Sequence, residues 1–267
     1  MKRIITILVF SMLVISCARN AITGRNQLSL VSESDLQAMA LVQYREFLNA
    51  NANAVVPSTN NDAAMVRRVG SRVAAAVKEY YRTHGLPNAL DNYNWEFNLV
   101  NNKQVNAWCM PGGKVVVYTG ILPITQTEGG LAIVLAHEIT HAVVGHGKER
   151  MSQGLAAQGL GALGGAALGS NSKAGSIFNT VYGVSAEYGV LLPNSRKQEL
   201  EADRYGLIFA ASAGYDPRVA IDFWTRMANM SNGQQPPIFM SSHPSDAQRI
   251  QGIKDVMAEA LTYYKGK

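Results

Sequence analysis

Residues 131–141 carry the sequence LAIVLAHEITH, and this stretch predicts a buried helix at the centre of the fold. Apolar residues occupy nearly every position around it, as in a helix without a solvent face. We expect the helix to run from about Glu128 to Arg150. His137 and His141 lie four residues apart. Their imidazoles therefore leave the helix on the same side, where two neutral rings can hold one Zn²⁺ ion.

The acid between the two histidines is typical of a catalytic metal site. Glu138 follows His137 directly and lies beside the predicted metal position, where it can reach a bound water. A structural zinc site has no need of such an acid. The alternative is that both histidines are ordinary core residues. It leaves two imidazoles and a carboxylate buried without partners for their polarity.

A third protein ligand is expected, because catalytic zinc binds three side chains and keeps a fourth position open. His146 lies five residues after His141, about 140° further round a continuous helix. We therefore expect His146 to support the site or to face solvent. Glu199, in a second predicted helix from Ser195 to Ala213, is the better candidate.

The second helix offers an acid beside this ligand. Asp203 shares a face with Glu199 and can accept a hydrogen bond from the Nδ1–H of a ligand histidine, while Glu201 points elsewhere. Taken alone, such an acidic helix is more typical of a solvated surface. The two histidines upstream make Glu199 the strongest candidate for the third ligand.

The composition is that of a folded chain without nucleic-acid chemistry. The 267 residues are 47% hydrophobic and 16% charged, which excludes a disordered protein. Two cysteines, Cys17 and Cys109, cannot form a disulfide framework. The formal net charge of +5 falls to +3 without residues 1–16, which hold two basic residues and no acid. We expect no nucleic-acid partner.

The first segment resembles a bacterial lipoprotein signal. Lys2 and Arg3 precede an apolar run at residues 4–15, which is too short to span a bilayer. The run ends in Val-Ile-Ser before Cys17, similar to the lipobox at which such signals are cut and the cysteine thiol is lipidated. The alternative is an ordinary secretory signal with an incidental cysteine.

This interpretation divides the chain into a lipoprotein signal peptide at residues 1–16, a lipidated tether at 17–30 and a zinc-binding domain at 31–267. Acyl chains on Cys17 would anchor the protein to a membrane. Ala18, rather than an acid, follows the cysteine, which favours the outer membrane with the domain facing the periplasm.

The remaining pattern predicts an α+β fold, mainly helical with a small β-sheet. Strands are expected at 95–99, 104–110 and 114–118, the last two joined by a Pro-Gly-Gly turn, with one kinked strand over 104–118 as the alternative. Further helices are expected from Ser34, which fits a capping box with Gln37, at 62–85, at 216–229 and at 245–264. Residues 154–189, crowded with Gly and Ala, predict a flexible flap, with a tightly packed small-residue helix as the alternative. A Pro-rich loop is expected at 231–242.

Four motifs in order resemble the HtpX, Oma1 and CAAX prenyl protease family of zinc peptidases. They are the segment 106–113, the pair of histidines with its acid at 137–141, the segment 195–203, and His243-Pro244 with Arg249. The resemblance covers about residues 22–250 and is closest to the soluble outer-membrane lipoprotein and periplasmic members, such as LoiP and BepA.

The resemblance implies a zincin-like fold of the gluzincin type, in which Glu199 is the third zinc ligand beside His137 and His141. It implies endopeptidase activity on misfolded or misassembled envelope proteins, with Glu138 as the general base that deprotonates a zinc-activated water. His243 is the candidate donor to the oxyanion, and Arg249 a weaker one.

The segment with Asn106, Pro111, Gly112 and Gly113 is a candidate for substrate binding. Its strand can serve as an edge to which an extended peptide adds by main-chain hydrogen bonds. Such binding has weak sequence preference and suits unfolded polypeptides.

Two other functions fit parts of the pattern. One is a chaperone-like outer-membrane assembly factor that keeps zinc for structure, with little or no proteolytic activity. The other is a zinc hydrolase acting on cell-wall peptide. The presence of Glu138 argues against a purely structural zinc site.

We predict that Cys17→Ala releases the protein from the membrane, because the lipobox supplies the only anchor that the sequence indicates. Fractionation of cells that express the variant checks this. A variant that stays wholly in the membrane pellet contradicts the lipoprotein assignment.

Overall fold

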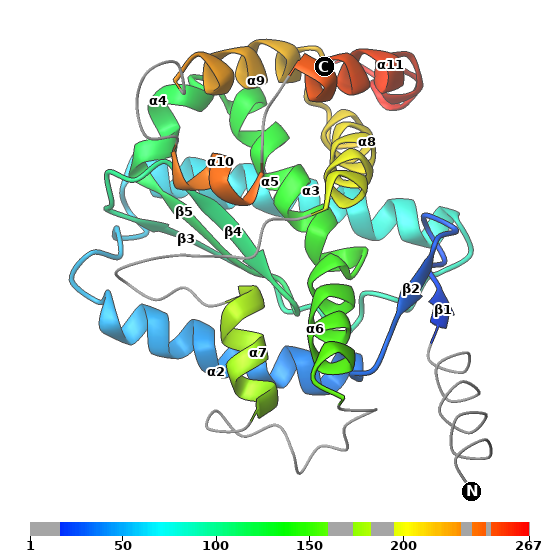
Figure 1. Cartoon of the computed structure of the whole chain (residues 1–267). Helices are drawn as coiled ribbons and strands as arrows, with labels where there is room; N and C mark the ends of the chain where they lie inside the picture. Colours follow the sequence, from blue (N-terminus) through cyan, green and yellow to red (C-terminus); the bar gives the residue numbers. More distant parts are fainter. Residues whose placement is uncertain (1–16, 160–172, 183–194, 231–236, 244–246, 267) are drawn as a thin grey trace, which may run out of the picture.

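The computed structural model describes residues 17–159, 173–182, 195–230, 237–243 and 247–266. A three-stranded sheet lies at its centre, with helices on both faces (Figure 1). The predicted α+β class, mainly helical with a small sheet, is confirmed. No helix among the described residues is long and apolar enough to cross a membrane.

The central sheet consists of β3 (Glu96–Val100), β4 (Ala107–Met110) and β5 (Lys114–Tyr118) in the order β3-β5-β4. β3 runs parallel to β5, and β4 runs antiparallel to it. The predicted Pro-Gly-Gly turn joins β4 to β5. Gly112 and Gly113 have φ values of 80° and 83°, a left-handed conformation that glycine adopts without strain.

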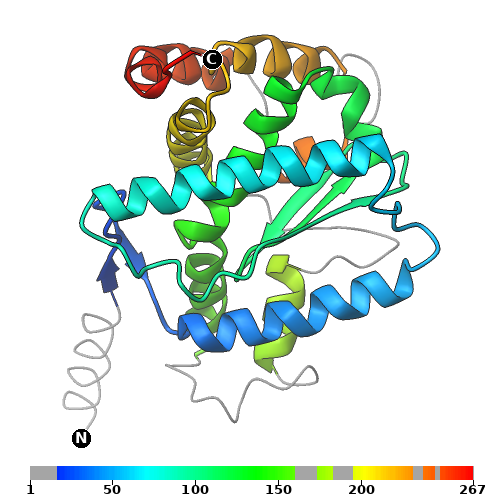
Figure 2. The ribbon, with the colours of Figure 1, turned by 180° about the vertical axis from the view of Figure 1, so that it is seen from behind.

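Alternation along the strands divides the core into two clusters. One face packs on α3 (Asn61–Thr83) and α5 (Glu128–Val143), and the other packs on α2 (Glu33–Ala50) and α7 (Lys173–Tyr182). Figure 2 shows α2 and α3 on opposite sides of the sheet. The first face is formed by Phe97, Leu99, Val115 and Val117, and the second by Val100, Trp108, Val116 and Tyr118.

The remaining helices pack on the first cluster, except α6, which contributes Met151 and Leu155 to the second. They are the 3-10 turn η1 (Thr119–Ile121), α4 (Leu122–Thr125), α6 (His146–Ala157), α8 (Arg196–Ser212), α9 (Val219–Asn229), α10 (Ile238–Ser242) and α11 (Ala247–Tyr263).

Helix α8 lies unusually close to α5. Its start is fixed by a capping box in which Ser195 and Gln198 satisfy each other's backbone amides. Gly206 permits the approach, because a Cβ at this position would lie 3.1 Å from the backbone nitrogen of His137. The acidic first half of α8 is thereby held against the helix that carries the histidines.

The single helix predicted for residues 128–150 is wrong. α5 ends at Val143, Gly145 takes the left-handed conformation with φ 78°, and α6 begins at His146. A glycine in this conformation ends a helix with little strain. His146 therefore begins a new helix, so the rotation of about 140° expected for a continuous helix does not apply to it.

The flexible flap predicted for residues 154–189 is also wrong where the structure describes it. α6 continues to Ala157, and α7 buries an apolar face in the second cluster. The face of α7 comprises Ala174, Ile177, Phe178 and Val181. The rest of the predicted flap, residues 160–172 and 183–189, lies outside the described residues.

Two local predictions need correction. The cap of α2 is Ser32, whose side chain accepts a hydrogen bond from the Asp35 amide, and not Ser34. The loop predicted for 231–242 contains α10 at its end, while residues 231–236 lie outside the described part. With Ser32 as its cap, α2 begins at Glu33, two residues before the start that a cap at Ser34 implies.

The segment predicted as a tether is packed on the domain. β1 (Cys17–Arg19) pairs antiparallel with β2 (Asn26–Leu28), and β2 lies beside α6 (Figure 1). Buried donors hold it there, including the Leu30 amide, which donates to Ser152 Oγ at 2.9 Å. An extended linker would leave these groups in solvent, so residues 17–30 are a hairpin of the domain. Their lipidation stays a prediction.

Candidate metal centre

Three buried side chains from two helices converge on one point. His137 and His141 project from α5 with their Nε2 atoms 3.1 Å apart. Glu199 reaches them from α8, with Oε1 3.4 Å from His141 Nε2 and Oε2 3.5 Å from His137 Nε2. Zinc–ligand bonds of 2.0–2.1 Å in a tetrahedron separate ligand atoms by about 3.3 Å. The three side chains therefore fit a zinc ion.

The protonation states of His141 and Glu199 suit a metal ligand set. The pKa of His137 is lowered by burial, but hydrogen bonds to Asp203 and Glu199 outweigh burial and raise it to about 9. Burial lowers the pKa of His141 well below its usual value and keeps the ring neutral. Burial disfavours the ionised form of Glu199, but the neighbouring His243 and Arg249 outweigh it and hold the pKa of this carboxyl well below its usual range. A neutral imidazole and a carboxylate are the forms in which these residues bind zinc.

Glu138 lies next to the three ligand side chains but is not one of them. The side chain is buried, and Oε1 accepts no hydrogen bond from the described residues. The Nε2 atom of His243 lies 3.3 Å from that oxygen. Burial raises the pKa of the Glu138 carboxyl. A buried carboxylate with a raised pKa and one oxygen without a hydrogen-bond donor is available to accept a proton.

His243 lies closer to the metal position than the sequence indicates. It follows α10, and its Nδ1 is 3.0 Å from Glu199 Oε1 and 3.2 Å from His137 Nε2. One atom from each of His137, His141, Glu199 and His243 lies within 4.8 Å of the others. In this conformation His243 can serve as a fourth ligand as well as a hydrogen-bond donor. Pro244, which completes its motif, lies outside the described residues.

The family model described as peptidase family M48 matches residues 61–257, which contain all of these side chains. The chain belongs to peptidase family M48. This confirms the resemblance to the Oma1, LoiP and BepA group, and zinc is the metal of this family.

Members of M48 from mitochondria and bacteria are similar over most of the chain. Mitochondrial metalloendopeptidase OMA1 of Schizosaccharomyces pombe is 32% identical over 90% of this chain and 66% of its own length. Metalloprotease LoiP of Escherichia coli is 27% identical over 78% and 82%. The beta-barrel assembly-enhancing protease of Yersinia pestis is 30% identical over 60% and 34%. The chain spans 66%, 37% and 64% of three of the mitochondrial OMA1 proteins that it matches.

Behind the M48 ligands, Asp203 and Arg249 form a buried pair. Asp203 Oδ1 lies 3.0 Å from His137 Nδ1, which orients that ring. Arg249 donates from Nε and Nη2 to Asp203 at 2.8 and 2.7 Å, and its Nη1 lies 2.9 Å from Glu199 Oε2. The guanidinium also stacks 3.5 Å from the centre of the Trp224 ring. Sequence reasoning missed Trp224, because one aromatic residue in an amphipathic helix carries no signal of its own.

His146 belongs to the surroundings of the site and is fully buried, which excludes a surface position. Its Nδ1 lies 2.8 Å from His141 Nδ1. The break at Gly145 makes this contact possible. If Gly145 is recognised as a helix terminator, the sequence indicates that His146 can approach His141.

The residues predicted for substrate binding lie on or beside one edge of the sheet. β4 is an edge strand of the three described strands and packs against α5. Asn106 precedes β4, and its carbonyl accepts a hydrogen bond from the Tyr118 amide at 3.0 Å. Pro111, Gly112 and Gly113 form the turn at the other end.

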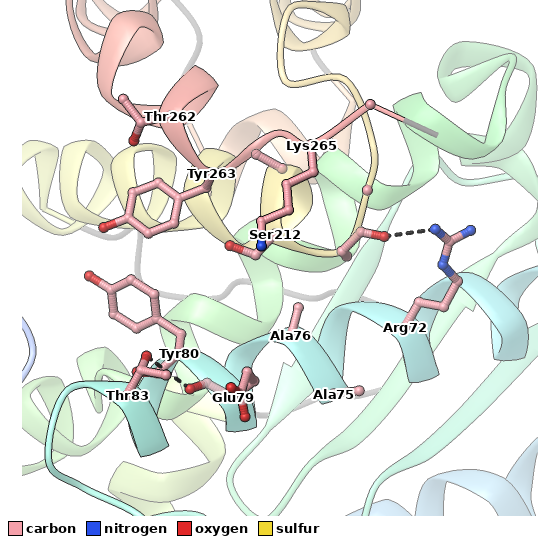
Figure 3. Close-up of a pocket in the computed structure, with 14 residues that line it drawn as sticks. Arg72, Ala75, Ala76, Glu79, Tyr80, Thr83, Ser212, Thr262, Tyr263 and Lys265 are labelled. Atoms are coloured by element: carbon pink, nitrogen blue, oxygen red, sulfur yellow. Dashed lines mark hydrogen bonds between the residues drawn. The ribbon is translucent and has the colours of Figure 1, made fainter.

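A cavity of about 610 Å³ lies away from the histidines, between α3, the end of α8 and the end of α11. Figure 3 shows Tyr80 and Tyr263 with their rings facing each other at this cavity, 5.8 Å apart. None of the ligand side chains lines it. The cavity is therefore separate from the metal centre.

We predict that Glu199→Ala binds zinc much more weakly than the parent protein, because it removes the only carboxylate among the ligands. Metal analysis after dialysis at equal free zinc checks this. Glu259→Ala is the matched control, because Glu259 is an exposed glutamate that pairs with Arg204 far from the site. Equal zinc content in Glu199→Ala and Glu259→Ala contradicts the assignment of the third ligand.

Proposed function

We propose that the protein is a zinc-dependent endopeptidase of the bacterial cell envelope that hydrolyses misfolded or misassembled envelope proteins. The observation that carries the proposal is the buried Glu138 carboxylate beside a complete set of zinc ligands. Bacterial relatives named metalloprotease and beta-barrel assembly-enhancing protease support the envelope setting. A structural zinc site, as in a chaperone-like assembly factor, gives no reason for that carboxylate.

Bound zinc supplies a Lewis acid that polarises the scissile carbonyl and makes water acidic. Glu138 accepts the proton of the attacking water and delivers it to the leaving amine. Its raised pKa brings the carboxyl closer to the pH at which both transfers are fast. Asp203 and Arg249 keep the His137 ring and the Glu199 carboxylate in position during the reaction.

The oxygen of the scissile carbonyl becomes negatively charged in the reaction. His243 is a candidate to stabilise it by a hydrogen bond, in addition to the zinc. Its Nε2 faces Glu138, and its Nδ1 faces Glu199, so the ring borders the space where the carbonyl reacts. A donor in that position strengthens its hydrogen bond as negative charge develops.

The edge of β4 that pairs with no other described strand is the proposed binding site for substrate. An extended polypeptide can pair with this edge through its backbone, which is independent of sequence. Unfolded chains meet that requirement, whereas folded proteins do not. A lipid anchor at Cys17 would hold the enzyme at the outer membrane, beside such clients.

We predict that Glu138→Gln retains zinc and loses cleavage activity by about 10²–10⁴-fold, because the amide cannot accept the proton. The measurement is steady-state cleavage of an unfolded outer-membrane protein by the zinc-loaded variant, with chelator-treated parent protein as the blank. Full activity in the variant refutes the peptidase mechanism. Absence of cleavage by the zinc-loaded parent protein, on unfolded protein and on cell-wall peptide alike, favours the assembly-factor alternative.

We predict that His243→Phe also retains zinc, because three other ligands remain, and that kcat falls by about 10²–10³-fold with a smaller change in KM. The same assay measures both constants. A change in KM alone assigns His243 to substrate binding. An increase in kcat identifies it as a fourth ligand that competes with water.

A further inference from the structure

The zinc ligand His141 has a second ring nitrogen that points away from the metal position. Its Nδ1 lies 2.8 Å from Nδ1 of His146, and the two rings meet edge to face. Two ring nitrogens at this distance share one proton, so one donates and the other accepts. Nε2 of His141 faces the metal and is unprotonated there. The proton therefore lies on Nδ1 of His141, and His146 accepts it.

The same argument determines which ring nitrogen of His146 carries the proton. With its Nδ1 accepting, the proton of this ring lies on Nε2, which is 3.0 Å from Glu201 Oε2. An ionised carboxylate can only accept, so Glu201 requires the tautomer that the metal requires from the other end. The hydrogen bond from His141 to His146 and the one from His146 to Glu201 therefore run in the same direction.

Arg25 holds the outer end of this path. Its Nε donates to both oxygens of Glu201, at 2.7 and 3.0 Å, and its Nη1 and Nη2 donate to Glu149 at 2.5 and 2.7 Å. The three side chains are between 8% and 16% exposed. Loss of the guanidinium would leave two poorly solvated carboxylates side by side without a cation. Glu201 would then turn toward water and release His146.

The hairpin at residues 17–30 sets the position of Arg25. Asn20 and Gln27 both donate side-chain hydrogen bonds to the carbonyl of Val144, at 2.9 and 3.2 Å. This carbonyl lies at the end of α5, where helical partners are missing. The Tyr205 hydroxyl donates to the Ile22 carbonyl at 2.9 Å. The hairpin is thus fastened at the break between α5 and α6, next to His146.

The other histidine ligand is supported more directly. His137 Nδ1 meets the carboxylate of Asp203 at 3.0 Å, without an intervening ring. Support of this kind, from a carboxylate to a ligand imidazole, raises metal affinity by about 10–100-fold. For His141 the carboxylate is one imidazole further away and depends on an arginine from a remote part of the chain.

We propose that His146, Glu201 and Arg25 are positioning residues for the zinc ligand His141, and that the hairpin at residues 17–30 is thereby a working part of the metal centre. The proposal rests on the metal site and not on peptidase activity, so it is tested without a substrate. Its failure would leave the proposed function intact.

The experiment measures the zinc dissociation constant of the full-length folded protein by competition with a chromophoric chelator. We expect His146→Leu, which cannot accept a hydrogen bond, to weaken binding by about 10–100-fold. His146→Asn should recover part of this loss, because its amide oxygen can replace Nδ1 as acceptor. Arg25→Ala should weaken binding in the same direction. The visible spectrum of the Co²⁺-loaded proteins should change in His146→Leu, since it reports ligand geometry.

Two control variants separate positioning from general stability. Arg19→Ala removes an arginine of the same hairpin, whose Nε donates to the Gly24 carbonyl, and His84→Ala removes an exposed histidine that directly follows α3. Both should bind zinc like the parent protein. Parent-like affinity in Arg25→Ala and His146→Leu overturns the proposal. Equal weakening in Arg25→Ala and Arg19→Ala also overturns it, because the effect would then not depend on the contacts of Arg25 with Glu201 and Glu149.

Discussion

The structure depends on the close approach of two imidazole nitrogens, His137 Nε2 and His141 Nε2, which lie 3.1 Å apart inside an apolar helix. Polar groups buried in this way cost several kcal/mol each unless they find partners. A cation between them would supply the partner, and two further elements bring side chains to the same position. Gly206 lets α8 approach far enough for Glu199 to complete the ligand set, and α10 ends where His243 can reach it.

Helix α8 serves both histidines through acids at alternate positions. Glu199 and Asp203 are one turn apart and face α5, where they meet the metal position and His137. Glu201 leaves the helix on another side, as its position requires, yet it still acts on the site through His146. Helix α8 is therefore buried at Glu199 and Asp203, where Arg249 contacts both carboxylates. Glu201 pairs with Arg25.

The parts of the site that were predicted from the sequence are those with a short, regular spacing. His137, Glu138 and His141 follow from helical periodicity, and Glu199 from a second helix with a clear cap at Ser195. The missed features depend on tertiary context. Gly145 is an exception, because a glycine that ends a helix could have been recognised in the sequence, whereas α7 is helical because the second cluster buries one of its faces. Neither the stacking of Arg249 on Trp224 nor the reach of Arg25 to Glu201 leaves a local pattern.

The docked hairpin changes the geometry of the proposed membrane anchor. An extended segment of 14 residues, such as the predicted tether at 17–30, would reach about 45–50 Å. In the structure this length is folded back as β1 and β2 against α6, and Cys17 is the first residue of β1. Acyl chains on Cys17 would therefore be attached to the domain itself, with no long spacer between. The membrane would then restrict the orientation of the metal centre, since the residue that follows the hairpin turn, Arg25, is fixed to the helices that carry the ligands.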